Sequence, residues 1–200
     1  METVLLGWPP DEPTLRLDYR RFSYAGKFVV SSTGKAVVRD PGEGTDGEYD
    51  DQILAAVAFN ADRNERETLW LRYITVRTDL RGDGLGPHLC RFVTDRAADR
   101  GYDRLKIAVN NPFAYEALYK VGFSFTGEET GVAELVLERP AGETAADRSR
   151  ETYQSGLDRY RARDLSSSER AFLNEKRGAD PPERSRPDRR FQTRVDRSDR

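Results

Sequence analysis

The clearest pattern of apolar and polar residues lies between residues 68 and 123. From Thr68 to Val76 apolar and β-branched residues occupy both alternating sets, which predicts a largely buried strand. One set, expected to share a face, is Leu69, Leu71, Tyr73 and Thr75. Helical spacing of apolar residues from Leu85 to Ala97 predicts a helix opened by Pro87.

A second strand and a second helix follow in the same stretch. Leu105–Val109 is a short apolar run, and residues 112–121 carry a helical pattern that ends at Gly122. Two strands joined by a helix of this length predict a right-handed βαβ crossover with parallel strands.

Apolar runs on either side enlarge the predicted sheet. Residues 52–59 are expected to pair with residues 68–76 as an antiparallel hairpin, and residues 131–138 form a further strand. This order of elements predicts an α/β fold, a mixed sheet flanked by helices, in one domain that spans residues 1–140.

The first fifty residues have a weaker pattern. Residues 1–13 contain three prolines and are expected to be irregular. Residues 24–30 and 35–39 flank a Ser-Ser-Thr-Gly stretch and predict a hairpin, although a short helix between residues 18 and 28 is an alternative.

Beyond residue 140 the composition becomes more charged. Residues 141–178 predict a charged helical extension, with a capping box at Ser166 that starts its second helix. Residues 179–200 are rich in Pro, Arg, Asp and Ser and predict a disordered tail. The first helix has a narrow apolar stripe that we expect to dock on the domain, on a second copy in a homodimer, or on another partner: Tyr153, Leu157 and Tyr160.

Composition excludes several classes of function. The 200-residue chain has a net charge of −2, and acidic residues nearly cancel the arginines of its tail, which argues against nucleic acid as a partner. No apolar run approaches the roughly 18 residues of a membrane span, and the N-terminus lacks a basic signal region. One cysteine, Cys90, excludes an internal disulfide and fits a reducing compartment, so we expect a cytoplasmic protein.

A glycine-rich turn separates the first strand from the first helix. Its sequence, residues 81–86, is Arg-Gly-Asp-Gly-Leu-Gly. Free N–H groups and the positive end of the helix dipole make such a turn an anion site, most naturally for phosphate. The dinucleotide fingerprint G-x-G-x-x-G and a Walker lysine are both missing from it.

These residues carry a resemblance. The motif Arg81-x-x-Gly84-x-Gly86, after a strand that ends Ile74-Thr75-Val76, resembles the acetyl-CoA signature of the GNAT superfamily of N-acetyltransferases. The family's N-x-x-A…GF segment is matched by Asn111, Ala114, Gly122 and Phe123, and the resemblance covers residues 52–138.

The resemblance implies a splayed central sheet and acetyl-CoA as the co-substrate. The pantetheine arm would lie beside the end of the first strand, and the pyrophosphate would bind at the turn. The cofactor-binding residues that it implies are Ile74, Thr75, Val76, Arg81, Gly82, Asp83, Gly84, Leu85, Gly86 and Asn111. A carboxylate facing phosphate is unfavourable, so Asp83 is expected to turn toward Arg81 or Arg104.

Relatives usually place a tyrosine on the second helix to protonate the leaving thiolate. In this chain that position is Leu118, and we expect Tyr119, one residue later, to act as the general acid, with Tyr115 as the alternative. Both tyrosines share a helix face, because residues four apart are about 40° apart on it.

A general base is harder to assign. The strand position where many relatives carry a glutamate is Trp70, which leaves Glu65 and Glu67 to act through water or to be surface charges. His88 follows the turn and is expected to be non-catalytic. No cluster of His, Cys and acidic residues has metal-ligand spacing, so no metal is expected.

The sequence therefore predicts an N-acetyltransferase that moves an acetyl group from acetyl-CoA to an amine of a small molecule or protein. The acidic loop 41–51 would attract a cationic acceptor. The alternative is a non-catalytic acyl-CoA-binding module whose C-terminal arm binds a partner. Candidates to line the acceptor pocket are Trp70, Tyr73, Phe22, Tyr24 and Phe28.

Overall fold

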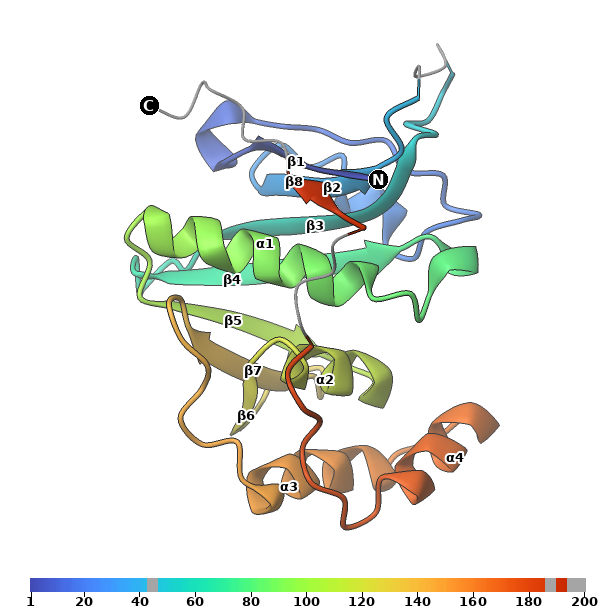
Figure 1. Cartoon of the computed structure of the whole chain (residues 1–200), viewed down its shortest axis with the longest axis vertical. Coiled ribbons are helices and arrows are strands. Elements are labelled where there is room, and N and C mark those ends of the chain that lie inside the picture. The colour runs from blue at the N-terminus through green and yellow to red at the C-terminus, as the bar shows by residue number, and fades with distance from the viewer. Residues whose placement is uncertain (43–46, 186–189, 194–200) are drawn as a thin grey trace.

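The computed structural model describes residues 1–42, 47–185 and 190–193. Within them it shows one mixed sheet with the strand order β6-β7-β5-β4-β3-β2-β1-β8 (Figure 1). The strands are β1 (Glu2–Gly7), β2 (Gly34–Arg39), β3 (Ile53–Ala61), β4 (Thr68–Val76), β5 (Arg104–Val109), β6 (Ser124–Glu129), β7 (Leu135–Pro140) and β8 (Gln192–Thr193). The helices are α1 (Leu85–Asp99), α2 (Pro112–Tyr119), α3 (Arg150–Arg161) and α4 (Ser167–Glu175).

The central βαβ unit lies where the sequence predicts it. β4 begins at Thr68 and ends at Val76, and it pairs in parallel with β5 and antiparallel with β3. α1 begins at Leu85, two residues before Pro87, with Gly84 as its N-cap. The predicted α/β class, a mixed and splayed sheet flanked by helices, is confirmed.

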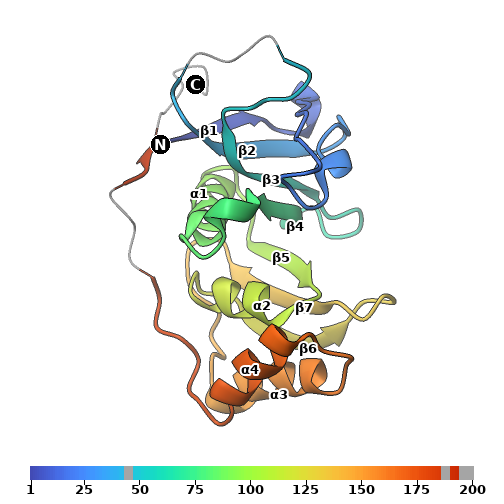
Figure 2. The same ribbon diagram turned by 90° about the vertical axis from the view of Figure 1, so that its right-hand side faces the viewer.

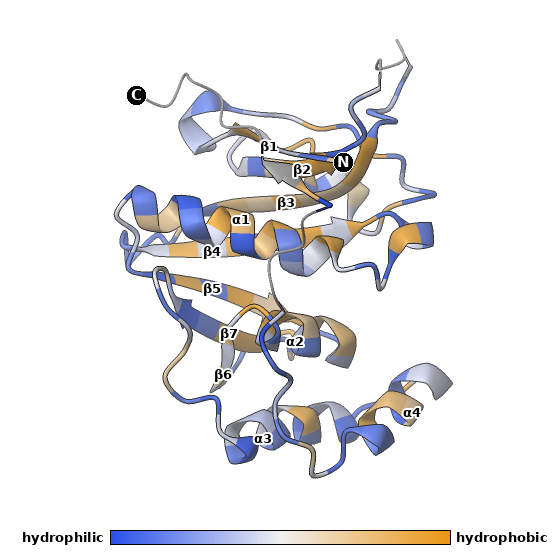
Figure 3. Cartoon of the chain, viewed as in Figure 1, coloured by the Kyte–Doolittle hydropathy of each residue, from blue (hydrophilic) through white to orange (hydrophobic). Residues whose placement is uncertain are grey.

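The two faces of the sheet are covered differently (Figure 2). α1 covers one face, where Leu71 and Leu89 belong to the same hydrophobic cluster. Along α1 hydrophilic and hydrophobic residues alternate, as in an amphipathic helix (Figure 3). The other face is covered by residues 13–33, whose Leu17 and Phe28 are buried in a second cluster.

The N-terminal region differs from the prediction in two places. Residues 1–13 contain β1, which pairs antiparallel with β2, because the first proline comes only at residue 9. Residues 24–30 form no strand; they contain the 3-10 turn Ala25–Lys27, after which the fully buried Phe28 turns into the core. The alternative prediction, a short helix between residues 18 and 28, corresponds in the structure to this single 3-10 turn.

A buried lysine attaches this irregular segment to the sheet. Lys35 on β2 is fully buried, and its Nζ donates hydrogen bonds to the carbonyl oxygens of Pro13, Val30 and Thr33 at 2.7, 2.6 and 3.0 Å. Burial lowers the pKa of Lys35. Three carbonyls from one segment converge on this group, so Lys35 holds residues 13–33 in place.

The C-terminal helices cover the other end of the sheet, beside β6 (Figure 1). β6 was missed by the sequence prediction because only its first two residues, Ser124 and Phe125, are buried. The capping box at Ser166 is present at the start of α4. The apolar stripe of α3 is buried on its own domain, with Tyr153 stacked on Tyr115 of α2 at 5.8 Å between ring centroids.

The described residues 179–185 and 190–193 of the tail contact the domain. In the described residues 190–193, Phe191 is only 8% exposed and stacks on His88 with ring centroids 4.0 Å apart. β8 adds in parallel to the edge of β1. The Phe191 ring thus packs on α1, and the short strand β8 pairs with an open sheet edge. The mean composition of a polar segment does not reveal such single contacts. The rest of the tail from residue 194 lies outside the described residues.

Candidate functional site

β4 and β5 part at a bulge in β4. Their parallel pairing stops at Leu71 and Ile107, although β4 continues to Val76. The pairing of β4 with β3, on its other side, skips Arg72 at the same point. An extra residue bends a strand and increases its twist. Residues 72–76 therefore have no β5 partner for their main-chain groups.

The bulge also changes which side chains share a face. The simple alternation placed Leu69, Leu71, Tyr73 and Thr75 together, and this was wrong. Leu69 and Leu71 lie in the cluster under α1, whereas Tyr73 packs on the cluster under the N-terminal segment. One inserted residue shifts a pattern of period two by one position, so the side chains beyond it exchange faces.

Thr75 contains an unsatisfied polar group in the parted region. Its side chain is 4% exposed, and its hydroxyl has no hydrogen-bond partner among the described residues. A buried group left unpaired costs about 1–3 kcal/mol, so native structures usually provide a partner. A ligand laid along residues 72–76 would supply one, which agrees with the implied place of the pantetheine arm.

The glycine turn leaves open space for a ligand. Gly82 and Gly84 have φ of +96° and +83°, and a Cβ at either would meet nothing within 4 Å. Leu85 is buried by its side chain, so only its main chain faces the turn. A Cβ on Gly86 would lie 3.7 Å from Val76 Cγ2, which brings the turn and the end of β4 together.

The two charged residues of the turn lie differently from expectation. Arg81 Nη2 donates to Ser23 Oγ at 2.8 Å, and Arg104 pairs with Glu138 at 3.6 Å. Neither pairs with Asp83 as we had expected; each contacts an oxygen of another segment instead. The main-chain carbonyl of Asp83 accepts from Arg190 of the tail at 3.3 Å.

The end of β5 leads into the N-cap of α2. Asn111 Oδ1 accepts from the main-chain N–H of Ala114 at 2.9 Å, so its amide oxygen caps the helix. Its Nδ2 donates to Asn110 Oδ1 at 3.2 Å. Asn111 thus acts first on helix geometry, and its contact with a cofactor remains a prediction.

Tyr119 does not lie at the parted strands. It is fully buried; its hydroxyl accepts a hydrogen bond from the Phe125 N–H at 3.0 Å and lies 3.3 Å from the Tyr115 hydroxyl. Its ring packs on Tyr153 of α3 at 4.8 Å between centroids. The phenol is enclosed by protein and engaged in structural bonds, so this placement does not favour the general-acid assignment, which stays a prediction.

The alternative, Tyr115, is enclosed in the same way. Its hydroxyl donates to the carbonyl of Tyr153 at 3.1 Å, and burial, then the neighbouring Tyr119, raises the pKa of Tyr115 far above its ordinary value. Leu118 is 3% exposed and belongs to the core. α2 therefore presents no proton donor at the usual position.

The other acid–base candidates lie away from the parted strands. Glu65 accepts from the Thr68 hydroxyl at 3.1 Å and pairs with Lys106, at the opposite end of β4 from residues 72–76. Trp70 donates its indole N–H to Asp62. His88 bonds Thr3 Oγ1 at 2.7 Å, within the first turn of α1. Within the described part of the chain, the hydrogen bonds of Glu67 are those that its main-chain carbonyl accepts from residues 103 and 104.

The N-terminal segment crosses the end of the parted strands, a feature that the sequence did not predict. The carbonyl of Arg21 accepts from both the N–H and the hydroxyl of Thr78, at 2.9 and 2.8 Å. Asn110 Nδ2 donates to the Tyr24 hydroxyl at 3.3 Å. With Ser23 bound to Arg81, this segment contacts the glycine turn and the end of β5. Its only sequence signal was a concentration of aromatic residues.

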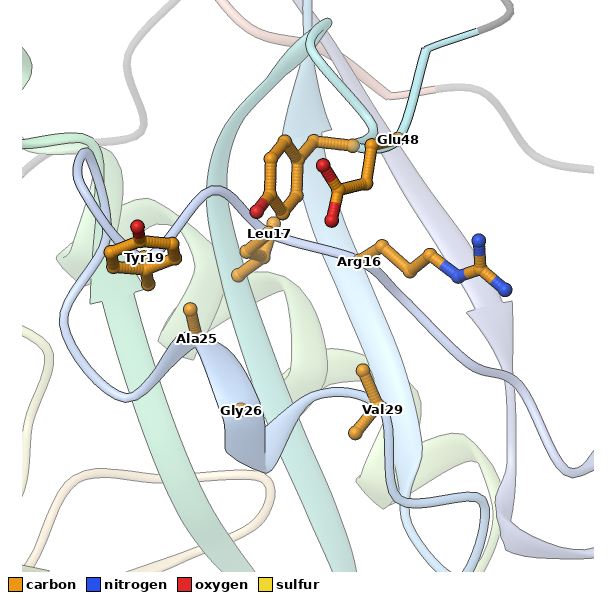
Figure 4. Close-up of a pocket in the computed structure, with 8 residues that line it drawn as sticks. Arg16, Leu17, Tyr19, Ala25, Gly26, Val29 and Glu48 are labelled. Carbon is orange, nitrogen blue, oxygen red and sulfur yellow. The ribbon is translucent and has the colours of Figure 1, made fainter.

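A pocket of about 340 Å³ lies on the N-terminal segment (Figure 4). The 3-10 turn with Ala25 and Gly26 forms one side, and Glu48 of the acidic loop lies on the other. Tyr49 of the same loop also lines the pocket. Residues 43–46 of that loop lie outside the described residues. Since Ala25 directly follows Tyr24, the pocket and the parted strands share one chain segment.

Other chemistries find little support in the described part of the chain. Burial raises the pKa of Cys90 to about 12, so this thiol is no nucleophile at neutral pH. Residues 1–42, 47–185 and 190–193 contain no group of three His, Cys, Asp or Glu side chains that could hold a metal ion. No helix in these ranges is both long and apolar enough to cross a membrane.

Several solved structures resemble this fold. A nourseothricin acetyltransferase matches with 22% identity and a TM-score of 0.45, over 55% of this chain and 65% of that one. An N-acetyltransferase from Staphylococcus aureus Mu50 matches with 19% identity and a TM-score of 0.46, over 55% and 68%. A PaiA N-acetyltransferase from Thermoplasma acidophilum, in complex with coenzyme A, matches with 13% identity and a TM-score of 0.42, over 53% and 59%. This chain thus spans less than two thirds of the nourseothricin acetyltransferase.

A search of curated proteins found no match. The family model of the acetyltransferase (GNAT) family matches residues 7–123. The match begins well before residue 52, so the irregular N-terminal segment belongs to the matched region, and it includes β4, the glycine turn and α2. It covers more than half of the 200 residues. The chain belongs to the acetyltransferase (GNAT) family.

Proposed function

We propose that this protein transfers an acetyl group from acetyl-CoA to an amine by direct attack on the thioester. The observation that carries the proposal is the meeting of two features at one end of the sheet. Main-chain groups of residues 72–76 have no partner on β5, and the open turn 82–86 lies against the same strand end. Acetyl-CoA would fit both features: its thioester arm would lie along residues 72–76, and its diphosphate would bind at the turn.

Each part of the site then has a role. The turn N–H groups would bind the pyrophosphate at the positive end of α1, with Arg81 close by. Residues 72–76 would pair with the pantetheine arm as a neighbouring strand does, and the hydroxyl of Thr75 would gain its missing partner. A main-chain N–H aimed at the thioester oxygen would stabilise the charge that develops there, an effect worth about 2.7–4 kcal/mol for one donor.

The acceptor amine would enter from the N-terminal segment. Glu48 places a carboxylate on the pocket next to this segment, which favours a positively charged amine over an acidic one. Glu65 lies at the wrong end of β4 to act as a base, so the amine would lose its proton to water before it attacks.

The glycine turn offers a sharp test with a matched control. Gly84 and Gly101 lie at opposite ends of α1, with φ of +83° and +79° and open space around each. Replacing either with alanine strains the backbone by about 1–2 kcal/mol. Only at Gly84 would the new Cβ enter the phosphate site. We expect Gly84→Ala to weaken coenzyme A binding about 10-fold by calorimetry, and Gly101→Ala to leave it unchanged.

Turnover distinguishes the enzyme from the alternative module. Purified protein would be mixed with acetyl-CoA and spermidine, benzylamine or a lysine-containing peptide, and free thiol followed. Binding without turnover on any amine would favour the non-catalytic acyl-CoA-binding module. The burial of Tyr119 is the structural observation that agrees with this alternative. No heat with coenzyme A or acetyl-CoA would contradict both readings.

A further inference from the structure

Tyr24 stands between the two parted strands. Its hydroxyl lies 3.3 Å from Nδ2 of Asn110, the first residue after β5. Its ring centroid lies 6.1 Å from that of Tyr73, which is on β4 just beyond the bulge. A residue from the N-terminal segment therefore places a phenol at the point where β4 and β5 separate.

The core does not account for this position. Phe22 and Phe28, on either side of Tyr24, are 5% and 0% exposed, whereas Tyr24 is 50% exposed. Tyr24 also has φ of +60°, in the left-handed region. A residue with a Cβ adopts this conformation at a cost of about 1–2 kcal/mol. The strained backbone at Tyr24 accompanies a ring that is half exposed, whereas the rings of Phe22 and Phe28 lie in the core. Such strain is concentrated at functional sites.

The surrounding contacts hold this conformation. The carbonyl of Tyr24 accepts from the N–H of Lys27 at 2.8 Å, and the preceding residue, Ser23, is bound by Arg81 of the glycine turn. The Nζ of Lys27 lies 5.8 Å from the centre of the Tyr73 ring. The segment that carries Tyr24 is thus bound to the glycine turn through Ser23 and packs on Tyr73 of β4 through Lys27.

An independent observation points to a ligand at the same place. Thr75, two residues beyond Tyr73 on β4, has the buried hydroxyl that lacks a partner among the described residues. Alternation along the strand puts Thr75 and Tyr73 on one face, the face that the N-terminal segment covers. The orphan hydroxyl and the Tyr24 phenol therefore border the same region.

We propose that Tyr24 is the catalytic residue that protonates the departing sulfur of coenzyme A, a deepening that rests on the proposed acetyl transfer. The amine nitrogen forms a bond to the acetyl carbon while the carbonyl electrons move to oxygen. When the carbonyl re-forms, the carbon–sulfur bond breaks and its electron pair leaves on sulfur. The proton of the Tyr24 hydroxyl passes to that sulfur. The new amide nitrogen loses its extra proton to water, and water returns a proton to Tyr24.

The decisive variant is Tyr24→Phe, which removes one oxygen and keeps the ring. We expect kcat to fall about 100-fold, as for loss of a general acid, while KM for acetyl-CoA changes less than 3-fold. Tyr102→Phe is the control. Tyr102 stacks on Trp8, and among the described residues its aromatic contact does not involve the parted strands. This variant is expected to keep the wild-type kcat.

The pH profile separates proton transfer from a structural role. In the wild type kcat should decline at alkaline pH as the acid loses its proton, and in Tyr24→Phe that decline should be missing. Asn110→Ala removes the only hydrogen bond that Asn110 makes to this phenol but keeps the phenol, so its alkaline decline should remain.

Three results would overturn the inference. Wild-type kcat in Tyr24→Phe would remove it and leave the acetyl transfer standing. Equal losses in Tyr24→Phe and Asn110→Ala, both with the wild-type pH profile, would show that the hydrogen bond only holds the segment. No turnover by the wild type on any amine would overturn both this inference and the proposed function.

Discussion

Two groups of tyrosines in this protein have opposite surroundings. Tyr24 and Tyr73 stand at the parted strands, and Tyr24 is half exposed. The four tyrosines between α2 and α3 are at most 1% exposed; they are Tyr115, Tyr119, Tyr153 and Tyr160. Burial raises the pKa of Tyr115, Tyr153 and Tyr160. A phenol can serve in proton transfer only where a substrate can reach it, so the residue type alone assigns no role.

The buried tyrosines serve instead to satisfy main-chain groups. Tyr160 donates to the carbonyl of Val109 at 2.9 Å, Tyr115 donates to that of Tyr153, and Tyr119 accepts from the N–H of Phe125. These bonds link α2 and β5 to α3, and α2 to β6. The C-terminal extension is therefore part of the packed structure at this end of the sheet.

The strongest test of this comparison removes the extension. Truncation after residue 147 deletes four residues that are at most 1% exposed, Tyr153, Leu157, Tyr160 and Leu173. At about 1.5–3 kcal/mol for each buried side chain, the loss approaches the whole stability of a typical domain, about 5–15 kcal/mol. We expect the truncated chain to be unfolded by circular dichroism, whereas truncation after residue 178 should keep the fold. A cooperative melt at the wild-type temperature for the shorter chain would show that the extension is dispensable.

The methyl group added by Gly156→Ala is expected to give the next largest loss of stability among the variants that keep the fold. A Cβ at Gly156 of α3 would lie 2.1 Å from the Tyr115 hydroxyl oxygen, so Gly156→Ala pushes the helices apart. Alanine favours a helix over glycine by about 1 kcal/mol, but overpacking costs about 1–3 kcal/mol. We expect a lower free energy of unfolding in urea. Ser155→Ala, at the neighbouring exposed position, is the control and should be neutral or slightly stabilising. Stabilisation by Gly156→Ala would mean that α3 does not pack this closely.

The smallest expected effect on catalysis is that of Tyr119→Phe, which separates stability from catalysis. Tyr119→Phe leaves the buried N–H of Phe125 without its acceptor, which should cost about 1–3 kcal/mol of unfolding free energy. Because Tyr119 is enclosed, kcat and its pH profile should remain those of the wild type. A lower kcat together with a lost alkaline decline would instead return the general-acid role to Tyr119.

The sequence by itself determined the parts that depend on neighbours in the chain. Periodicity located β4 and α1, the capping residues located the start of α4, and the glycine turn lies open at the N-terminus of α1 as expected. These features follow from local geometry: strand and helix periods, caps and positive φ. They were sufficient to indicate the fold class and the family resemblance.

Only the tertiary structure decided where the phenols lie. Tyr119 is enclosed because α3, more than thirty residues later, has no side chain at Gly156 and packs directly on its helix. Tyr24 reaches the parted strands because its segment is bound to Arg81 and Asn110, more than fifty residues away in the chain. The bulge at Arg72 depends on pairing with β3. Such contacts join residues distant in sequence, and no local pattern records which of them form.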